Sequence, residues 1–259
     1  MTETMTLYLP TVKREIIIEL SIPKDTTQKW DTLYFLDGQN AFTDQHATYK
    51  RSIRAAKYLN YISKETNRPI LGIGLYNALS DLGRISEYSP FKLTNLAYPS
   101  WKKQDLNWFQ SFCKDFVSLI IPTIEARFNT SSHRFIYGSS LAALTAIYLG
   151  YRYNLFEGVG AFSTASFLCA KELEDFIRKE FKPTVKLFIY VGKNEVSDDL
   201  YDSAIYYQSA KRLYELVSKL GGKPRLVVSQ KGTHCEASWE KQLPEFLSFL
   251  YFDMVSYIV

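Results

Sequence analysis

The segment His133-Arg-Phe-Ile-Tyr-Gly-Ser-Ser-Leu-Ala-Ala-Leu-Thr-Ala-Ile-Tyr-Leu-Gly150 decides the fold of this chain. Its aromatic and β-branched residues up to Tyr137 predict a buried strand that stops at Gly138. Ser140 follows at the bend, and the run from Leu141 is rich in helix formers. A strand, a serine on a tight turn and a helix form the arrangement that presents a nucleophilic serine.

The five residues from Gly138 to Ala142 fit the pattern G-x-S-x-G, with alanine in place of the second glycine. The backbone N–H groups of the first turn of the helix have no partner within it, so that of Leu141 is available to bind an oxyanion. By themselves these residues also fit a plain Gly-Ser turn. The choice therefore depends on whether suitable partners for Ser140 exist.

Composition restricts the function classes. The chain has 259 residues, 46% of them hydrophobic, which suits one large domain with a sizeable core. The net charge is +4, but the 31 basic and 27 acidic residues form no basic stripe, so nucleic-acid binding is not expected. Three widely spaced cysteines predict no disulfide framework and no metal site.

The sequence shows no signal-peptide pattern and no apolar run long enough to span a membrane. We therefore expect a soluble, cytoplasmic protein without membrane association. The sequence leaves the oligomeric state open, a homo-oligomer included.

Strands and helices are predicted to alternate along the chain. The expected strands cover 14–23, 32–36, 69–76, 135–137, 158–163, 185–192 and 225–230. The expected helices cover 49–63, 105–128 with a kink at Pro122, 171–181, 203–220 and 238–255, besides the one from Leu141. This alternation predicts a single α/β domain over residues 1–259, with a mostly parallel sheet and helices on both faces. Residues 77–103 show no clear period and are expected to be a long loop near the site.

A serine nucleophile needs a base, and the chain has three histidines. His133 begins the strand that ends before Ser140, which places it at the opposite end of the sheet. His46 lies in an early loop and remains an alternative. His234 follows the last predicted strand and is the stronger candidate for the base.

The third member should be a carboxylate that orients the histidine. Glu195 directly follows the strand before the last one, so the order Ser140, Glu195, His234 matches the order of α/β hydrolases. Asp198, Asp199 and Asp202 are rivals, although they also suit the acidic start of a helix. The turn Asp37-Gly38-Gln39-Asn40 is expected to supply a second oxyanion donor, with Gln39 preferred and Gly38 or Asn40 as neighbours.

Five segments in the same order resemble the putative esterase family of α/β hydrolases, which also contains enterochelin esterase, esterase D-like and feruloyl esterase proteins. They are Tyr34-Phe-Leu-Asp-Gly-Gln-Asn-Ala-Phe42, Arg84-Ile-Ser-Glu-Tyr-Ser-Pro-Phe91, Tyr137-Gly-Ser-Ser-Leu-Ala142, Gly192-Lys-Asn-Glu195 and Gly232-Thr-His234 with Trp239. The resemblance implies an α/β-hydrolase fold and an esterase without a cofactor, in which Ser140, Glu195 and His234 have the roles assigned above. Ala142 and Lys193 depart from residues usual in the family.

The sequence thus predicts a serine ester hydrolase that forms an acyl-enzyme from a small ester, with short-chain acyl or aryl esters preferred. Asn40, Arg84 and Tyr88 are expected to contact the substrate, while Arg84 and Glu87 could instead pair with each other. Two alternatives remain: an acyltransferase with the same residues, and an inactive hydrolase-fold binding module.

Overall fold

The computed structural model describes residues 2–24, 27–94, 103–195 and 203–255. One sheet of eight strands runs through this part of the chain, in the order β1-β2-β4-β3-β5-β6-β7-β8. The strands are Thr2–Leu9 (β1), Arg14–Ser21 (β2), Trp30–Leu36 (β3), Ile70–Leu75 (β4), Thr130–Ser139 (β5), Gly158–Phe162 (β6), Lys186–Asn194 (β7) and Arg225–Thr233 (β8). Strands β3 to β8 are parallel, while β1 and β2 are antiparallel. The predicted α/β-hydrolase type of fold is confirmed.

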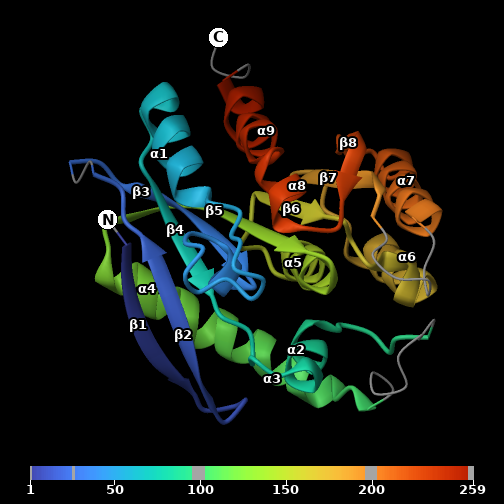
Figure 1. The fold of residues 1–259 in the computed structure, drawn as a ribbon, viewed down its shortest axis with the longest axis horizontal. Coiled ribbons are helices and arrows are strands. Elements are labelled where there is room, and N and C mark those ends of the chain that lie inside the picture. The colour runs from blue at the N-terminus through green and yellow to red at the C-terminus, as the bar shows by residue number, and fades with distance from the viewer. Residues whose placement is uncertain (1, 25–26, 95–102, 196–202, 256–259) are drawn as a thin grey trace.

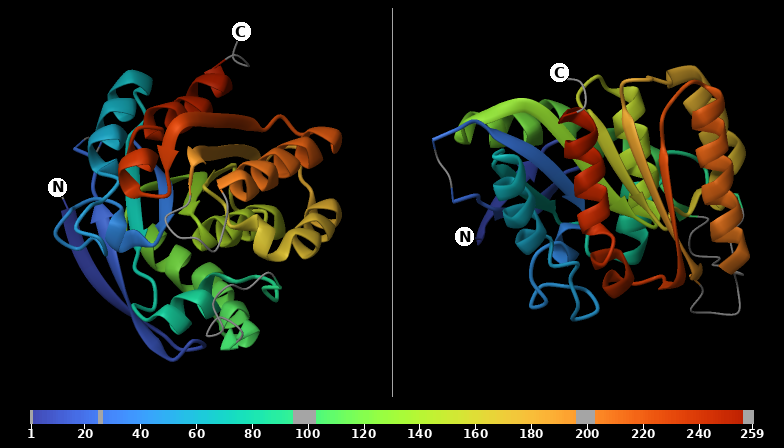
Figure 2. Two further views of the ribbon diagram at one scale, coloured as in Figure 1. Left: turned by 45° about the vertical axis from the view of Figure 1, so that its right-hand side comes forward. Right: turned by 90° about the horizontal axis from the view of Figure 1, so that it is seen from above.

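Helices cover both faces of the sheet (Figure 1). One face carries Ala55–Thr66 (α1) and Leu243–Val255 (α9), which follows the short Glu236–Glu240 (α8). The other carries Asp81–Tyr88 (α2), Leu106–Asp115 (α3), Ile121–Arg127 (α4), Leu141–Arg152 (α5), Ala170–Glu180 (α6) and Ser203–Lys219 (α7). Figure 2 shows the sheet between these two layers. Both faces of the central strands are apolar because both are covered.

The strand β1 was not predicted, although its residues carry the signal. Exposure alternates along Thr2–Leu9, and the inner residues Met5, Leu7 and Leu9 pack on the core. This period of two is typical of a strand with one covered face. The register pairs Thr2 with Ser21 and Leu9 with Arg14, so the hairpin with β2 extends the sheet at its edge.

The predicted helix over 105–128 is interrupted. Between α3 and α4, residues Phe116–Ile120 form a π-helical turn, and Pro122 stands in the first turn of α4. Proline has no N–H, and its ring crowds the carbonyl group four residues earlier, so the chain widens before it. The helix is thus irregular just before Pro122, the position at which the sequence predicted a kink.

The segment 77–103 was predicted to be a long loop, but it is not simply a loop. Its first part forms α2, whose N-cap Ser80 accepts a hydrogen bond from the N–H of Gly83, with Asp81 in the first turn. The cap and the acidic first turn were readable in the sequence. Part of this segment, 95–102, lies outside the described residues.

The register brings five strand ends to one edge of the sheet. Phe35 pairs with Tyr137, Ser139 with Phe162, Phe162 with Tyr190, and Asn194 with Thr233. The residues that follow these strands therefore form a row along the carboxyl edge, where open α/β sheets bind their ligands.

Candidate active site

Ser140 occupies a sharp turn between β5 and α5. Its backbone angles, φ 58° and ψ −123°, are rarely adopted by a residue with a side chain. The turn is held from both sides, because the Ser140 N–H donates to the carbonyl of Phe162 at 2.9 Å and its carbonyl accepts the N–H of Ala165 at 3.3 Å. The strained residue is thus fixed at the carboxyl edge, and its side chain is half-buried.

Gly138 permits this turn through its lack of a side chain. A Cβ atom there would lie 2.3 Å from the carbonyl oxygen of Ala142 and 2.5 Å from its carbon. The first turn of α5 therefore crosses directly over β5. This close approach requires glycine at the first position of the motif, whereas Ala142 is accommodated at the second with no exposure.

His234 and Glu195 form a hydrogen-bonded pair at the ends of β8 and β7. The Nδ1 of His234 lies 2.8 Å from Oε2 of Glu195, whose side chain is fully buried. The other oxygen, Oε1, accepts the Gly192 N–H at 2.6 Å and the Ser163 hydroxyl at 2.7 Å. These donors replace the water that an ionised carboxylate loses on burial. With Nδ1 donating to Glu195, Nε2 of His234 can accept a proton.

Two rings enclose the imidazole of His234. Tyr206 of α7 lies with its ring centroid 5.1 Å from that of His234, and Trp239 of α8 packs nearly perpendicular to it at 5.2 Å. Among the described residues, no hydrogen bond joins the Ser140 hydroxyl to His234. Such contacts are often long in ligand-free sites and shorten when substrate binds.

The turn after β3, which is the neighbour of β5 in the sheet, offers unpaired N–H groups. Gly38–Asn40 form a single 3-10 turn, and the Asn40 N–H donates to the Asp37 carbonyl at 2.9 Å, which excludes Asn40 as an oxyanion donor. Within the described part of the chain, the N–H groups of Gly38, Gln39 and Leu141 have no hydrogen-bond partner. The turn packs tightly on β4, since a Cβ atom on Gly38 would lie 2.1 Å from Gly74.

Asp37 supports this turn in a left-handed conformation, with φ 53°. Its carboxylate accepts from Arg84 Nε at 2.9 Å and Nη2 at 2.6 Å, and from Asn77 Nδ2 at 2.6 Å. Its N–H donates to the Tyr88 hydroxyl at 3.0 Å. One buried carboxylate thus connects the turn to α2 and to Asn77, which follows β4.

Comparison with known proteins identifies the family. The family model described as Putative esterase matches residues 10–250. The chain belongs to this esterase family. It is a carboxylic-ester hydrolase, as the sequence predicted. A search of curated proteins gave no match.

Solved structures of low sequence identity share the fold of this esterase. An IroE-like serine hydrolase from Shewanella oneidensis has a TM-score of 0.81 at 18% identity, covering 98% of this chain and 81% of the other. The siderophore hydrolase EstA from Aspergillus nidulans has a TM-score of 0.75 at 14% identity, covering 97% and 94%. A ferulic acid esterase from Anaeromyces mucronatus has a TM-score of 0.71 at 18% identity, covering 98% and 92%.

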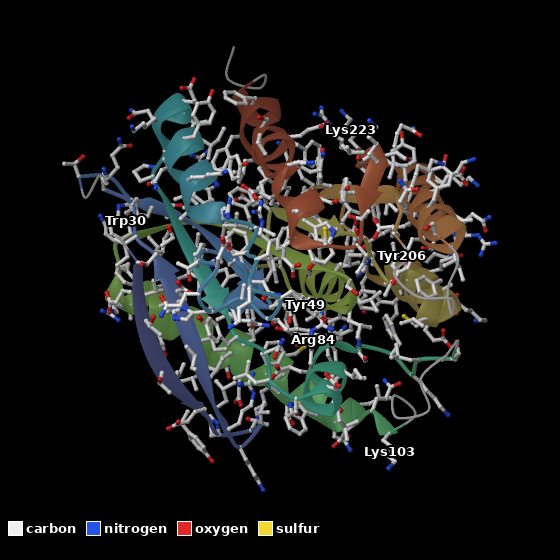
Figure 3. All side chains as sticks on the ribbon, in the orientation of Figure 1. Trp30, Tyr49, Arg84, Lys103, Tyr206 and Lys223 are labelled. Carbon is white, nitrogen blue, oxygen red and sulfur yellow. The ribbon has the colours of Figure 1, made fainter. Side chains whose placement is uncertain are left out.

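The predicted pairing of Arg84 with Glu87 is wrong. Glu87 accepts from Arg14 of β2 at 2.7 Å, while Arg84 binds Asp37. Arg84 and Glu87, both on α2, thus pair with residues at the ends of two different strands. The sequence could not indicate these pairings. In Figure 3, Arg84 lies next to the exposed Tyr49.

Two residues expected to contact substrate, Tyr88 and Asn40, make hydrogen bonds within the protein. Tyr88 is fully buried, with its hydroxyl on Asp37, so it lies behind the turn. Asn40 uses its amide inside the protein: Nδ2 donates to Glu236 at 3.1 Å, and Oδ1 accepts the Thr48 N–H at 2.8 Å. Burial raises the pKa of Glu236, which follows His234 by two residues.

The other two histidines do not join Glu195. His46 lies 3.5 Å from Glu19 of β2 and packs on Tyr76. His133 pairs with Glu157 at 2.9 Å, beside the start of β6 and away from the carboxyl edge. The rival acids Asp198, Asp199 and Asp202 lie outside the described residues.

Ser163 is the site residue that the sequence reasoning missed. It follows β6 in the row of strand ends, and its hydroxyl contacts Glu195. A serine after the strand next to the nucleophile strand was a visible signal, but its contact depends on the register. Trp239 had been noted only as part of a motif, and its indole N–H donates to the Ser163 hydroxyl at 2.8 Å.

A cavity of about 180 Å³ lies between α6 and α7. Its apolar walls come mainly from Phe167, Leu173, Ile177, Ile205 and Leu213. Phe167 contacts the ring of Tyr206 at 4.8 Å, and Tyr206 contacts His234. Two aromatic side chains, Phe167 and Tyr206, therefore separate the cavity from the candidate base His234.

The described residues contain neither a metal-binding cluster nor a membrane-spanning helix. No group of three or more His, Cys, Asp or Glu side chains there is arranged to hold a metal ion. None of the helices in these ranges combines the length and apolarity needed to cross a bilayer.

Proposed function

We propose that this esterase uses Ser140 as nucleophile, His234 as general base and Glu195 as the acid that orients His234. The observation that carries the proposal is the buried Glu195–His234 hydrogen bond on the same sheet edge as the strained Ser140 turn. A carboxylate at Nδ1 fixes the tautomer in which Nε2 accepts a proton, and it stabilises the imidazolium that follows.

The reaction has two halves. His234 Nε2 takes the proton of the Ser140 hydroxyl while Oγ attacks the ester carbonyl carbon. The N–H groups of Leu141 and Gln39 bind the resulting oxyanion. The carbon–oxygen bond to the alcohol then breaks, His234 returns the proton to the leaving oxygen, and an acyl-enzyme remains. Water, deprotonated by His234, attacks the acyl carbon; Ser140 leaves with the proton and the carboxylic acid is released.

A fluorophosphonate probe tests this assignment without knowledge of the natural substrate. We expect one adduct per molecule, located on Ser140 by peptide mass spectrometry, and no adduct in Ser140→Ala. Ser139→Ala is the matched control, because it removes the neighbouring serine hydroxyl and should still be labelled. A folded wild-type protein that gives no adduct on Ser140 would overturn the assignment.

The substrate we infer is an ester with a short acyl or aryl group. The inference rests on the esterase family to which the chain belongs. The cavity between α6 and α7 is the acyl site to test, because its volume suits a small group, although Glu174 and Arg212 also line it and no residue of the proposed triad does. Leu213→Trp should fill it and lower kcat/KM for p-nitrophenyl butyrate more than for p-nitrophenyl acetate. Leu213→Met, which replaces leucine by a side chain of similar volume, should leave kcat/KM unchanged for both esters. An equal effect of Leu213→Trp on both esters would place the acyl group elsewhere.

A further inference from the structure

We propose that Ser163 and Trp239 are positioning residues that set the orientation of the Glu195 carboxylate toward His234. The inference rests on the proposed triad and adds two residues to it. Neither residue is expected to touch the substrate or the reacting atoms.

The direction of the hydrogen bonds follows from the donors available. The indole Nε1–H of Trp239 can only donate, and its partner 2.8 Å away is the Ser163 oxygen. The hydroxyl of Ser163 has one proton, which is then directed to Oε1 of Glu195 at 2.7 Å. With Oε1 occupied in this way, Oε2 is the oxygen left for His234 at 2.8 Å.

The chain of hydrogen bonds from Trp239 through Ser163 to Glu195, called the relay below, is buried and rigid. Ser163 and the Glu195 side chain have no exposure and Trp239 has 6%, so water does not compete for these bonds. Ser163 is fixed at φ 46°, and its N–H donates to the Tyr190 carbonyl at 2.7 Å. Hydrogen bonds in such surroundings are strong and costly to leave unmade.

Trp239 contacts both ends of the Glu195–His234 pair. Its N–H reaches Glu195 through Ser163, and its ring packs against the imidazole of His234. The two contacts are separable, because Trp239→Phe keeps an aromatic ring beside His234 and removes only the N–H donor. Ser163→Ala removes the hydroxyl itself.

The experiment measures the second-order rate of fluorophosphonate labelling of Ser140 in Trp239→Phe, Ser163→Ala and the double variant. We expect Ser163→Ala to lower the rate about tenfold, the effect of a lost hydrogen bond to a charged group. Trp239→Phe should lower it about threefold to tenfold, because the bond that it removes is to the neutral hydroxyl of Ser163. The labelling rate of the double variant should lie within about twofold of that of Ser163→Ala. Trp239 acts through Ser163, so its loss should add little once the Ser163 hydroxyl is gone. In both single variants, the midpoint of the acid limb of the pH–rate profile should move.

Ser89→Ala is the matched control. Ser89 is fully buried at the end of α2, outside the cavity between α6 and α7, and its hydroxyl has no hydrogen-bond partner among the described residues. Its rate should stay within about twofold of wild type. Ser163→Ala removes a single oxygen atom and remains informative if Trp239→Phe fails to fold.

The outcomes separate this inference from the triad itself. Effects of Trp239→Phe and Ser163→Ala that multiply in the double variant would overturn the relay. The relay would also be overturned if the variants showed a smaller labelled fraction but an unchanged labelling rate and an unmoved acid limb of the pH–rate profile. That result indicates only a loss of folded protein. If wild-type protein is labelled on Ser140 and the variants are labelled at the same rate, the relay is overturned and the proposed triad stands. No label on wild-type Ser140 would overturn both.

Discussion

The guanidinium of Arg84 binds both carboxylate oxygens of Asp37, with Nε 2.9 Å from Oδ1 and Nη2 2.6 Å from Oδ2. Asp37 begins the turn with unpaired N–H groups that follows β3, the neighbour in the sheet of the strand that ends before Ser140. An oxyanion donor must be held within a fraction of an ångström to stabilise a transition state. We therefore expect the ion pair between α2 and the turn to affect the rate of the proposed reaction.

We expect Arg84→Lys to lower kcat on p-nitrophenyl acetate about tenfold and to leave KM within about twofold. Lysine cannot make the two parallel bonds of a guanidinium, so the turn loses its fixed position while substrate binding persists. Arg68→Lys is the control, since Arg68 pairs with Asp31 at the opposite end of β3. A raised KM with unchanged kcat would show instead that Arg84 contacts the substrate, as the sequence analysis expected.

We expect Glu195→Gln to lower kcat by about 10³ to 10⁴ with little change in fold. The amide can present its N–H₂ to Nδ1 and so favours the wrong tautomer of His234. Glu236→Gln serves as the control, because Glu236 is also buried near His234 and bonds Asn40. Steady-state kinetics of Asp198→Asn and Asp199→Asn complete the test. A larger loss in either would transfer the acid role to that aspartate.

The two small residues of the Ser140 turn should differ in how much stability and activity a substitution costs. Gly138→Ala places a methyl group 2.3 Å from the Ala142 carbonyl oxygen, so we expect a loss of about 3 kcal/mol in the free energy of unfolding and loss of activity. Ala142→Gly should cost only about 1 kcal/mol, through weaker helix propensity, and retain activity. Urea unfolding and esterase assays measure both. Equal stability of the two variants would contradict the steric account.

Glu87 should make the stability of the protein depend on pH. Burial raises the pKa of Glu87 to about 7 from 4.5, although Arg14 opposes the shift. Between these values the folded state binds more protons than the unfolded state, so the free energy of unfolding falls as pH rises and levels off above about pH 7. The contribution lost is at most about 3 kcal/mol.

Urea unfolding of wild type and Glu87→Gln at several pH values between 4 and 8 measures this term. The stability of wild type relative to the variant should decline across the window. Glu215→Gln, on an exposed part of α7, should run parallel to wild type. A constant difference between wild type and Glu87→Gln would show that Glu87 stays ionised on folding.

The strand and helix pattern was predictable because each element carries its own period. Residues buried on both faces mark the central strands, and apolar stripes mark the helices. The segments missed were β1 and α2. Both are short or partly exposed elements at the margin of the core, where the hydrophobic signal is weaker than cap and alternation signals.

The sequence by itself determined the strand–serine–helix turn at Ser140 and the order of Ser140, Glu195 and His234, because local propensity and chain order are properties of the chain. Tertiary structure alone decided that Arg84 binds Asp37, that Tyr88 lies behind the turn, and that Ser163 and Trp239 join Glu195. Those contacts depend on which strand ends become neighbours in the sheet. Pairing register and burial, and not sequence distance, choose the partner of each polar side chain.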